Sequence, residues 1–321
     1  MPEINFEGVS YQSQTDESVL DCLLRHELEV PNSCRNGICQ TCLMRAVNGT
    51  PPQTSQKGLK PALVAQGYFL ACSCVPVEAM EVVLPNTAAF RRDTVVSEVH
   101  HCTPDIVRLR LKRPEGFDYC AGQFLTLFHP NGHGRSYSLA SLPQLEDYLE
   151  FHVHRYPGGK VSGWIANELQ TGDRLSVSEA IGECVYLPGS PDQPILLIAT
   201  GTGLAPLYGV LREALHRGHA GVIKLYHGSR NQAGLYLDKE LRQMAQDHPN
   251  LDYIPCLSGA DQPAGVEKGR ANEVALAQNP DLKGWRIYLC GVPDMVYAAK
   301  RAVFLAGASM QAIHSDPFVY H

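Results

Sequence analysis

The chain has 321 residues, of which 44% are hydrophobic and 19% are charged, and its formal net charge is −6. This length predicts two or three domains, and this composition excludes a disordered or fibrous protein. The negative charge argues against a nucleic-acid binder, which normally presents a basic face, and no apolar run reaches the roughly 20 residues of a membrane span. The acidic N-terminus lacks a signal-peptide pattern, so we expect a cytoplasmic protein without a membrane span. We also expect a monomer.

Residues 1–86 are rich in cysteine and in acidic side chains. They hold six of the eleven cysteines, and nine acidic side chains against five basic ones. Because thiols in the cytoplasm stay reduced, metal ligation is a better interpretation than disulfides. The negative charge either steers a basic partner towards this segment or only keeps the protein in solution.

Four of these cysteines have the spacing of a plant-type [2Fe–2S] site. Cys34, Cys39 and Cys42 form C-x4-C-x2-C, and Cys72 follows further along the chain. Such a loop places three thiolates around one side of a cluster, with backbone N–H groups directed at the sulfurs. Zinc is the alternative metal, although zinc sites usually present two short-spaced cysteine pairs. Cys74 is the alternative fourth ligand, and we favour Cys72.

Residues 93–188 follow a linker over 84–93 and read as short strands with period-2 alternation. The apolar positions of two such strands are Val107, Leu109, Leu111, Leu149, Phe151 and Val153. Charged or polar side chains lie between them, and glycine and proline separate the strands. This pattern predicts an antiparallel sheet or small barrel, with one short helix over 161–168.

Residues 189–321 change to strands that alternate with helices. We expect strands over 195–199, 222–227, 251–257 and 286–290, and helices over 204–217, 235–246 and 293–305. Strands alternating with helices indicate βαβ units and a parallel sheet. The turn Gly201-Thr202-Gly203 follows a strand and opens a helix, which is the context that a dinucleotide site requires, although the third glycine of the usual fingerprint is absent.

Several motifs in these two segments resemble the ferredoxin–NADP⁺ reductase family, and the resemblance covers the whole chain. They are Arg135-Ser136-Tyr137-Ser138, Gly158-Gly159-Lys160-Val161-Ser162, Gly201-Thr202-Gly203 with Pro206, and Cys290-Gly291 with Pro293. The order of the segments is similar to that of reductases for benzoate and naphthalene dioxygenases, soluble methane monooxygenase and CDP-6-deoxyhexose dehydrase. The resemblance implies a multi-domain protein. Its parts are a β-grasp (α+β) ferredoxin domain at 1–86, an antiparallel β-barrel FAD domain at 93–188 and an α/β parallel-sheet nicotinamide domain at 189–321.

The resemblance also implies roles for individual residues. Arg135 suits a flavin diphosphate as a bidentate cation, Tyr137 offers a ring to the isoalloxazine, and Ser138 offers a hydroxyl to flavin N5. Cys290 and Phe318 are placed with Ser138 at the reacting atoms, with Tyr320 as the alternative to Phe318. The full set of expected cofactor-binding residues is Arg135, Ser136, Tyr137, Ser138, His152, Val153, Gly158, Gly159, Lys160, Val161, Ser162, Gly201, Thr202, Gly203, Ser229, Arg230, Cys290, Gly291 and Phe318.

In the family that the chain resembles, the residues after the second strand of the α/β segment distinguish NADH from NADPH. Here these residues are Ser229 and Arg230. An arginine there suits the 2′-phosphate of NADPH, but Gly-x-Arg followed by Leu235-Tyr236 resembles NADH-dependent members. We favour NADH over NADPH.

The expected function is therefore electron transfer from NAD(P)H through FAD and a [2Fe–2S] cluster to an acceptor protein. We expect the acceptor to be an oxygenase component of the Rieske or di-iron type. A deoxysugar dehydrase is the alternative acceptor, supported by the C-terminal run from Ser315 to His321. A redox sensor or scaffold with vestigial cofactors is the alternative class of protein, and intact motifs in all three segments disfavour it.

Overall fold

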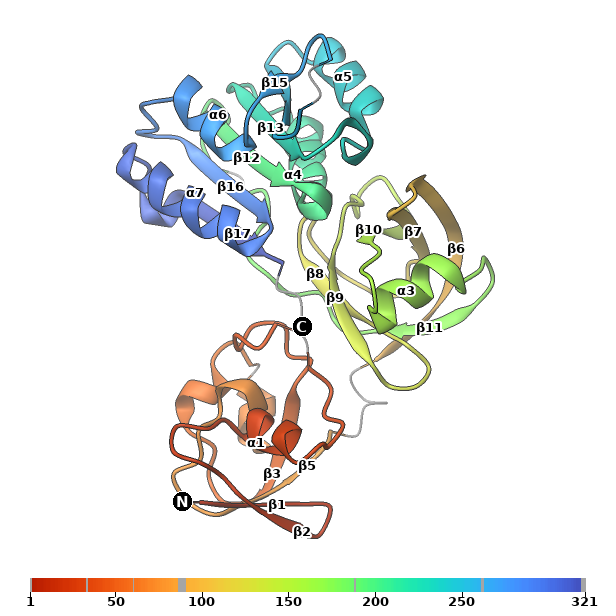
Figure 1. Ribbon diagram of the computed structural model, residues 1–321, viewed down its shortest axis with the longest axis vertical. Coiled ribbons are helices and arrows are strands. Elements are labelled where there is room, and N and C mark those ends of the chain that lie inside the picture. The colour runs from red at the N-terminus through yellow and green to blue at the C-terminus, as the bar shows by residue number, and fades with distance from the viewer. Residues whose placement is uncertain are drawn as a thin grey trace.

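The computed structural model describes residues 2–32, 34–59, 61–85, 91–187, 189–260 and 263–318. They form three modules, each built on its own sheet. We call them the N-terminal module (2–85), the barrel module (91–187) and the C-terminal module (189–318). Figure 1 shows the N-terminal and C-terminal modules at opposite ends of the long axis, with the barrel module between them. The centre of the expected linker and Pro188 lie outside the described residues.

The N-terminal module is a five-stranded sheet in the order β2-β1-β5-β3-β4, covered by a short helix. Its elements are β1 (Glu3–Phe6), β2 (Val9–Gln12), α1 (Val19–Arg25), β3 (Leu43–Asn48), α2 (Pro61–Ala65), β4 (Tyr68–Leu70) and β5 (Met80–Val83). The Ser18 side chain caps α1 by accepting the Asp21 amide. One face of α1 is buried against the sheet, so the loop with three of the expected cluster ligands leaves from a fixed helix and enters β3.

The barrel module is a six-stranded antiparallel sheet in the order β10-β7-β6-β11-β8-β9. Its elements are β6 (Arg92–Thr103), β7 (Ile106–Lys112), β8 (Phe124–Phe128), β9 (Gly134–Ser138), β10 (Tyr148–His154), α3 (Lys160–Asn167) and β11 (Arg174–Val177). A bridge between Leu139 and Phe151 joins the two edges of this order and closes the sheet. The predicted antiparallel barrel is confirmed.

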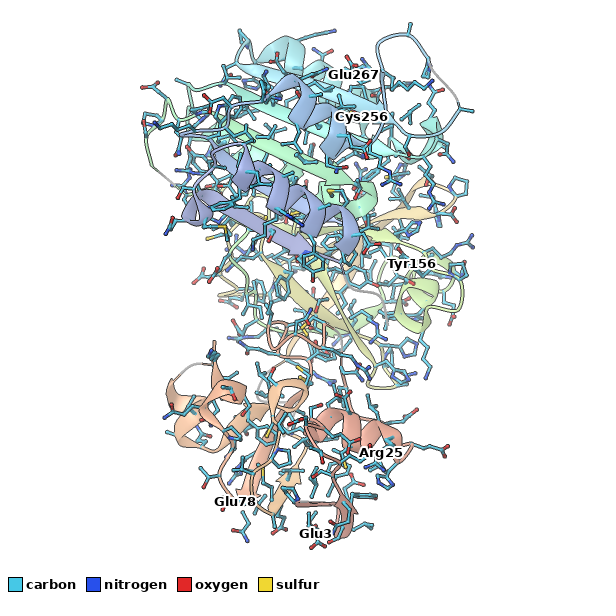
Figure 2. All side chains as sticks on the ribbon, turned by 60° about the vertical axis from the view of Figure 1, so that its left-hand side comes forward. Glu3, Arg25, Glu78, Tyr156, Cys256 and Glu267 are labelled. Carbon is cyan, nitrogen blue, oxygen red and sulfur yellow. The ribbon has the colours of Figure 1, made fainter. Side chains whose placement is uncertain are left out.

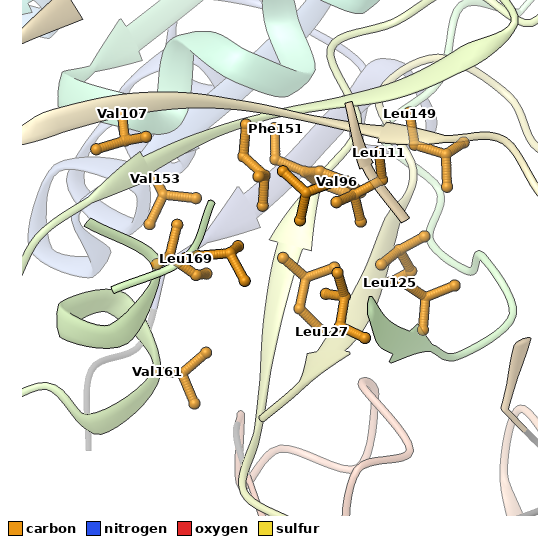
Figure 3. Close-up of a cluster of buried hydrophobic side chains, with 14 of the residues drawn as sticks. Val96, Val107, Leu111, Leu125, Leu127, Leu149, Phe151, Val153, Val161 and Leu169 are labelled. Carbon is orange, nitrogen blue, oxygen red and sulfur yellow. The ribbon is translucent and has the colours of Figure 1, made fainter. Parts of the chain in front are cut away.

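The alternating apolar residues fill the inside of this barrel. Figure 3 shows Leu111, Leu149 and Phe151 facing Leu125 and Leu127 of β8, with Val107 and Val153 on the side of Val161 and Leu169. The side chains between them point outwards, as period-2 strands require. Because one face of β9 and β10 packs inside the barrel, only the opposite face of these strands can line a site.

The C-terminal module is a six-stranded parallel sheet in the order β15-β14-β13-β12-β16-β17. Its strands are β12 (Ile195–Thr200), β13 (Ile223–Ser229), β14 (Leu251–Leu257), β15 (Glu267–Lys268), β16 (Arg286–Gly291) and β17 (Ile313–Pro317). Its helices are α4 (Leu204–His216), α5 (Asp238–Asp247), α6 (Ala271–Gln278) and α7 (Pro293–Leu305). Helices α4 and α5 pack with one face of the sheet, and α6 and α7 with the other. The predicted parallel sheet is confirmed.

Four elements of this module differ from the expectations. Helix α5 begins at Asp238 rather than near Leu235, because Leu237 has a left-handed backbone with φ of 59°. Helix α6 and the short strand β15, which pairs with β14, were not predicted. Strand β17 was not predicted either, and it lies parallel to β16, with Asp316 opposite Cys290.

No helix formed by the described residues has both the length and the apolar composition that crossing a bilayer requires.

Candidate cofactor site at the junction of the modules

A cavity of about 990 Å³ lies where the three modules meet. Figure 2 labels Tyr156, one of its lining residues, on the barrel module between the N-terminal module with Glu3, Arg25 and Glu78 and the C-terminal module with Cys256 and Glu267. The expected site residues that line the cavity are Cys34, Cys39, Arg135, Ser136, Tyr137, Ser138, His152, Gly158, Gly159, Lys160, Val161, Ser162, Thr202 and Phe318. The structure therefore brings residues from the expected cluster, flavin and nicotinamide segments to one space.

Backbone amides surround the sulfurs of the expected cluster ligands. The Gly37 amide donates to Cys72 Sγ at 3.2 Å, and the amides of Asn36 and Cys39 donate to Cys34 Sγ at 3.4 and 3.3 Å. Gly37 reaches this position with φ of +70° and with Ser73 packed against it, so a side chain would not fit. Donors of this kind stabilise the negative charge of a thiolate-bound cluster.

The four sulfurs are arranged as two pairs. A hydrogen bond from Cys39 lowers the pKa of Cys34 to about 5, and one from Cys42 lowers that of Cys72 to about 6. Two thiolates on each of two irons is the arrangement of a [2Fe–2S] cluster. The paired sulfurs and the amides directed at them therefore fit such a cluster.

Cys74 has the surroundings of a core residue. It is fully buried in the apolar core of the N-terminal module. Burial raises the pKa of its thiol to about 12. Cys72 Sγ instead accepts the Gly37 amide of the cluster loop at 3.2 Å, which supports Cys72 as the fourth ligand.

Cationic side chains and a helix start line the barrel side of the cavity. Arg135 on β9 and Lys160 at the start of α3 both line it, and Lys160 Nζ lies 3.1 Å from His133 Nε2. A Cβ at Gly159, the residue before α3, would collide with Ser162 Oγ. Bare backbone and positive charge at a helix start are the requirements of a diphosphate, so these residues fit the diphosphate of FAD.

Ser138 is hydrogen-bonded to a carboxyl group from the C-terminal module. Its Oγ donates to Asp316 Oδ2 at 2.9 Å. Burial raises the pKa of Asp316 to about 6, and the bond from Ser138 opposes that rise. Asp316 lies on β17, where no strand was predicted, and it was absent from the predicted site although it lines the cavity.

The nicotinamide motifs are only partly at the cavity. Thr202 lines it, whereas Gly201, Gly203 and Gly291 do not. Gly203 is instead pressed against the end of β16, where an added Cβ would collide with the Cys290 carbonyl. Because Gly203 has no side chain, the start of α4 packs directly against the end of β16.

Cys290 is fully buried and does not line the cavity. Its Sγ lies 3.4 Å from that of Cys184, and burial keeps the pKa of its thiol well above the usual range. Its expected place beside flavin N5 and the nicotinamide remains a prediction.

Three further expected residues, Val153, Ser229 and Arg230, do not line the cavity, whereas Phe318 does. Val153 points into the barrel core, so its side chain cannot contact a ligand in the cavity. Ser229 ends β13, and Arg230 follows it with an exposed side chain at the carboxyl edge of the sheet. Phe318 lines the cavity, and its amide donates to the Gly291 carbonyl at 2.8 Å. Tyr320, the alternative to Phe318, lies outside the described residues.

His152 connects the barrel module to the C-terminal module. Its Nδ1 lies 3.0 Å from the Tyr236 hydroxyl and its Nε2 lies 3.2 Å from Glu150 Oε1. The second carboxylate oxygen of Glu150 accepts from Arg110 Nε at 2.7 Å. The alternation along β10 was a usable sequence signal that Glu150 and His152 share the outward face of the strand. The sequence carries no such signal for Tyr236, the partner of His152.

Two contacts between the N-terminal and barrel modules were also not predicted. Arg135 Nη1 donates to the Asn32 carbonyl at 2.8 Å, and the hydroxyls of Thr41 and Thr126 lie 3.0 Å apart. Thr41 stands inside the cysteine motif, which was a usable signal for its place near the cluster. Thr126 carries no such signal, because contacts between domains leave no period in a single sequence.

Three protein families match successive parts of the chain. Residues 3–77 match the 2Fe-2S iron-sulfur cluster binding domain, residues 93–186 the oxidoreductase FAD-binding domain, and residues 197–301 the oxidoreductase NAD-binding domain. The expected cluster, FAD and NAD-binding modules are thereby confirmed. The protein is an oxidoreductase that combines flavin, nicotinamide and iron–sulfur domains in one chain.

Its relatives are reductase components of oxygenase systems. It is 32% identical to the ferredoxin–NAD(P)⁺ reductase component of the naphthalene 1,2-dioxygenase system of Pseudomonas putida, over 94% of this chain and 93% of the relative. It is 33% identical to the aromatic O-demethylase reductase subunit of an Amycolatopsis species, over 97% and 96%. The crystal structure of the Amycolatopsis reductase GcoB is similar with a TM-score of 0.70 and 32% identity over 99% of both chains. The chain belongs to this family of oxygenase-system reductase components.

Proposed function

We propose that the protein accepts electrons from NADH and delivers them, through FAD and a [2Fe–2S] cluster, to an oxygenase component in the cytoplasm. The observation that carries this proposal is the shared cavity, whose wall includes both the flavin motif of β9 and two of the cluster cysteines. Relatives with oxygenase partners in their names favour this acceptor over a deoxysugar dehydrase. Module boundaries at 86–93 and 188–189 are part of the same proposal.

When bound, FAD converts a two-electron hydride into single electrons, and the cluster carries these one at a time. The chain's own residues supply placement. Arg135 and Lys160 hold the diphosphate, Tyr137 and Phe318 supply aromatic walls, and Ser138 directs its hydroxyl to the reacting edge. These assignments are supported by the lining of the cavity.

The cluster ligands are proposed to be Cys34, Cys39, Cys42 and Cys72. The paired sulfurs and the amides directed at them support this set. Ser229, Arg230 and Thr202 are proposed to bind the nicotinamide dinucleotide, together with the glycine-rich turn. The preference for NADH is supported by the resemblance at Gly228-Ser229-Arg230 and is tested by comparing kcat/KM for NADH and NADPH.

A cysteine substitution tests the proposed order of carriers. In Cys39→Ser we expect NADH-driven reduction of the oxygenase component to be lost, because the cluster is lost, while NADH-driven reduction of ferricyanide through the flavin survives. Cys120→Ser is the matched control, since Cys120 is exposed and lies outside the cavity lining. Iron and acid-labile sulfide are measured on anaerobically purified protein. Zinc in place of iron, or loss of both activities in Cys39→Ser with flavin still bound, would contradict the proposal.

A further inference from the structure

A buried hydroxyl pair joins the cluster loop to the flavin barrel. Thr41 lies between Cys39 and Cys42 in the loop, and Thr126 lies on β8. Their Oγ1 atoms are 3.0 Å apart, and the two residues are only 9% and 1% exposed. Because both hydroxyls are shielded from water, each depends on protein partners for its hydrogen bonds.

The pair continues in both directions. On the barrel side, Thr126 stands opposite Ser136 in the β8–β9 register, with 3.4 Å between their hydroxyl oxygens. On the loop side, Thr41 stands two residues after Cys39 and directly before Cys42. Three hydroxyl groups therefore form a row from the flavin motif of β9 to the centre of the cysteine loop.

Burial makes these hydroxyl contacts depend on one another. Thr41, Thr126 and Ser136 can each donate one proton, so they share their hydrogen bonds along one row. Each hydroxyl polarises the next, an effect that is strong in a buried setting of low dielectric constant.

A second contact lies on the neighbouring residue of β9. Arg135 Nη1 donates to the carbonyl of Asn32, two residues before the first cluster cysteine. Arg135 and Ser136 are adjacent, so both contacts reach the loop from the same short strand. The loop is thus held at its entry and at its centre.

We propose that Thr41 and Thr126 are positioning residues for electron transfer, whose buried hydroxyl pair fixes the cluster loop on the flavin barrel. This inference rests on the proposed function and adds a defined contact between the modules of its two resident cofactors. Without this contact the cluster loop would be held less firmly on the flavin barrel, and placement of the cofactors is what the protein supplies to electron transfer.

The test compares Thr126→Val, which keeps shape and removes the hydroxyl, with Thr126→Ser, which keeps the hydroxyl. In the holoenzyme, flavin-to-cluster electron transfer is followed by stopped flow after mixing with NADH. The EPR spectrum and midpoint potential of the reduced cluster give a readout that does not depend on activity. Thr50→Val is the matched control, because Thr50 is an exposed threonine of the N-terminal module, which also contains Thr41.

In Thr126→Val we expect about fivefold slower flavin-to-cluster transfer, the effect of one hydrogen bond, with a changed EPR spectrum and midpoint potential because the cluster loop is held less firmly. Thr41→Val should show a change of similar size, and the double variant should not add to it, because both residues belong to one hydroxyl pair. Thr126→Ser and Thr50→Val should match the wild type.

Wild-type EPR and transfer rate in Thr126→Val would overturn the inference, and so would equal defects in Thr126→Val and Thr126→Ser, which would assign the effect to packing. If Thr126→Val does not fold, Thr41→Val against Thr41→Ser decides on the same criteria. Failure of the proposed function is distinguishable, because the wild type itself would then lack the iron signal or its reduction by NADH.

Discussion

Cys72 and Cys74 stand two positions apart and have different surroundings. Cys72 Sγ accepts the Gly37 amide at the cluster loop, whereas Cys74 is enclosed by the core of the N-terminal module. Spacing alone left both as candidates for the fourth ligand. Burial and amide donors separate them, and neither quantity is visible in a sequence.

Cys72→Ser is expected to abolish the iron signal, because it removes one of two thiolates on an iron. Cys74→Ala should retain the iron and lose about 1 kcal/mol of stability, as a small buried group is deleted. Iron analysis and thermal unfolding of both variants check this. Full iron content in Cys72→Ser with loss of iron in Cys74→Ala would reverse the assignment.

Other residues of the site show what a sequence can and cannot supply. The spacing of Cys34, Cys39 and Cys42 and the motif from Arg135 to Ser138 predicted their own places, because both are short and local. Asp316 was missed because its partner Ser138 lies 178 residues away. Buried polar contacts over such separations have no period and no spacing rule.

At the scale of elements, alternation predicted the barrel strands well. Residues 107–111 and 149–153 alternate cleanly because one face of each strand packs inside the barrel. The edge strand β17 reads Ile-His-Ser-Asp-Pro, with only one fully apolar side chain. Its pairing comes from the neighbouring β16 rather than from its own composition, so it could not be predicted.

Strand β10 places Glu150 between His152 and Arg110. Burial alone would raise the pKa of Glu150, but hydrogen bonds from His152 and Arg110 outweigh it and hold the pKa at about 2. A carboxyl group with a lowered pKa stabilises the fold above its ordinary pKa, near 4.5, and that stabilisation is lost as the pH falls towards 2.

Glu150→Gln should therefore destabilise the barrel at pH 7 by roughly 3 kcal/mol. The difference in Tm from wild type should stay constant down to a pH of about 5 and narrow below it. Glu179→Gln is the control, because its ion pair with Arg92 is exposed on both sides and is worth little. A difference that widens with acid would contradict the assignment.

The glycine-rich turn before α4 offers a second prediction at this scale. Gly203→Ala should destabilise the C-terminal module strongly and weaken NADH binding, because its Cβ meets the fixed carbonyl of Cys290. Gly201→Ala has open space and only a positive φ of +53° to oppose it, a cost of about 1–2 kcal/mol. Gly203→Ala should therefore unfold at a lower temperature than Gly201→Ala and have a higher KM for NADH. The reverse order would refute the packing argument.

At the scale of the whole molecule, the modules are joined by polar bonds from one module to the next. The bond between His152 and Tyr236 joins the barrel module to the C-terminal module, and both residues are buried. Three domains could be predicted from composition and period. Their mutual placement could not, because it depends on single side chains such as these.

Tyr236→Phe should leave His152 Nδ1 buried without its partner, at a cost of about 1–3 kcal/mol. We expect Tm to fall by a few degrees and flavin reduction by NADH to slow, as the C-terminal module is held less firmly. Tyr297→Phe, on the exposed face of α7, is the control. Unchanged Tm and rate in Tyr236→Phe would show that this bond does not hold the modules together.

The cavity wall takes residues from Leu24 on α1 to Phe318 after β17. All three modules must therefore be folded and docked before the site has its complete lining. A fragment that stopped short of β17 would lack Asp316 and Phe318, two residues of that lining. Truncation is thus a poor route to a smaller version of this protein.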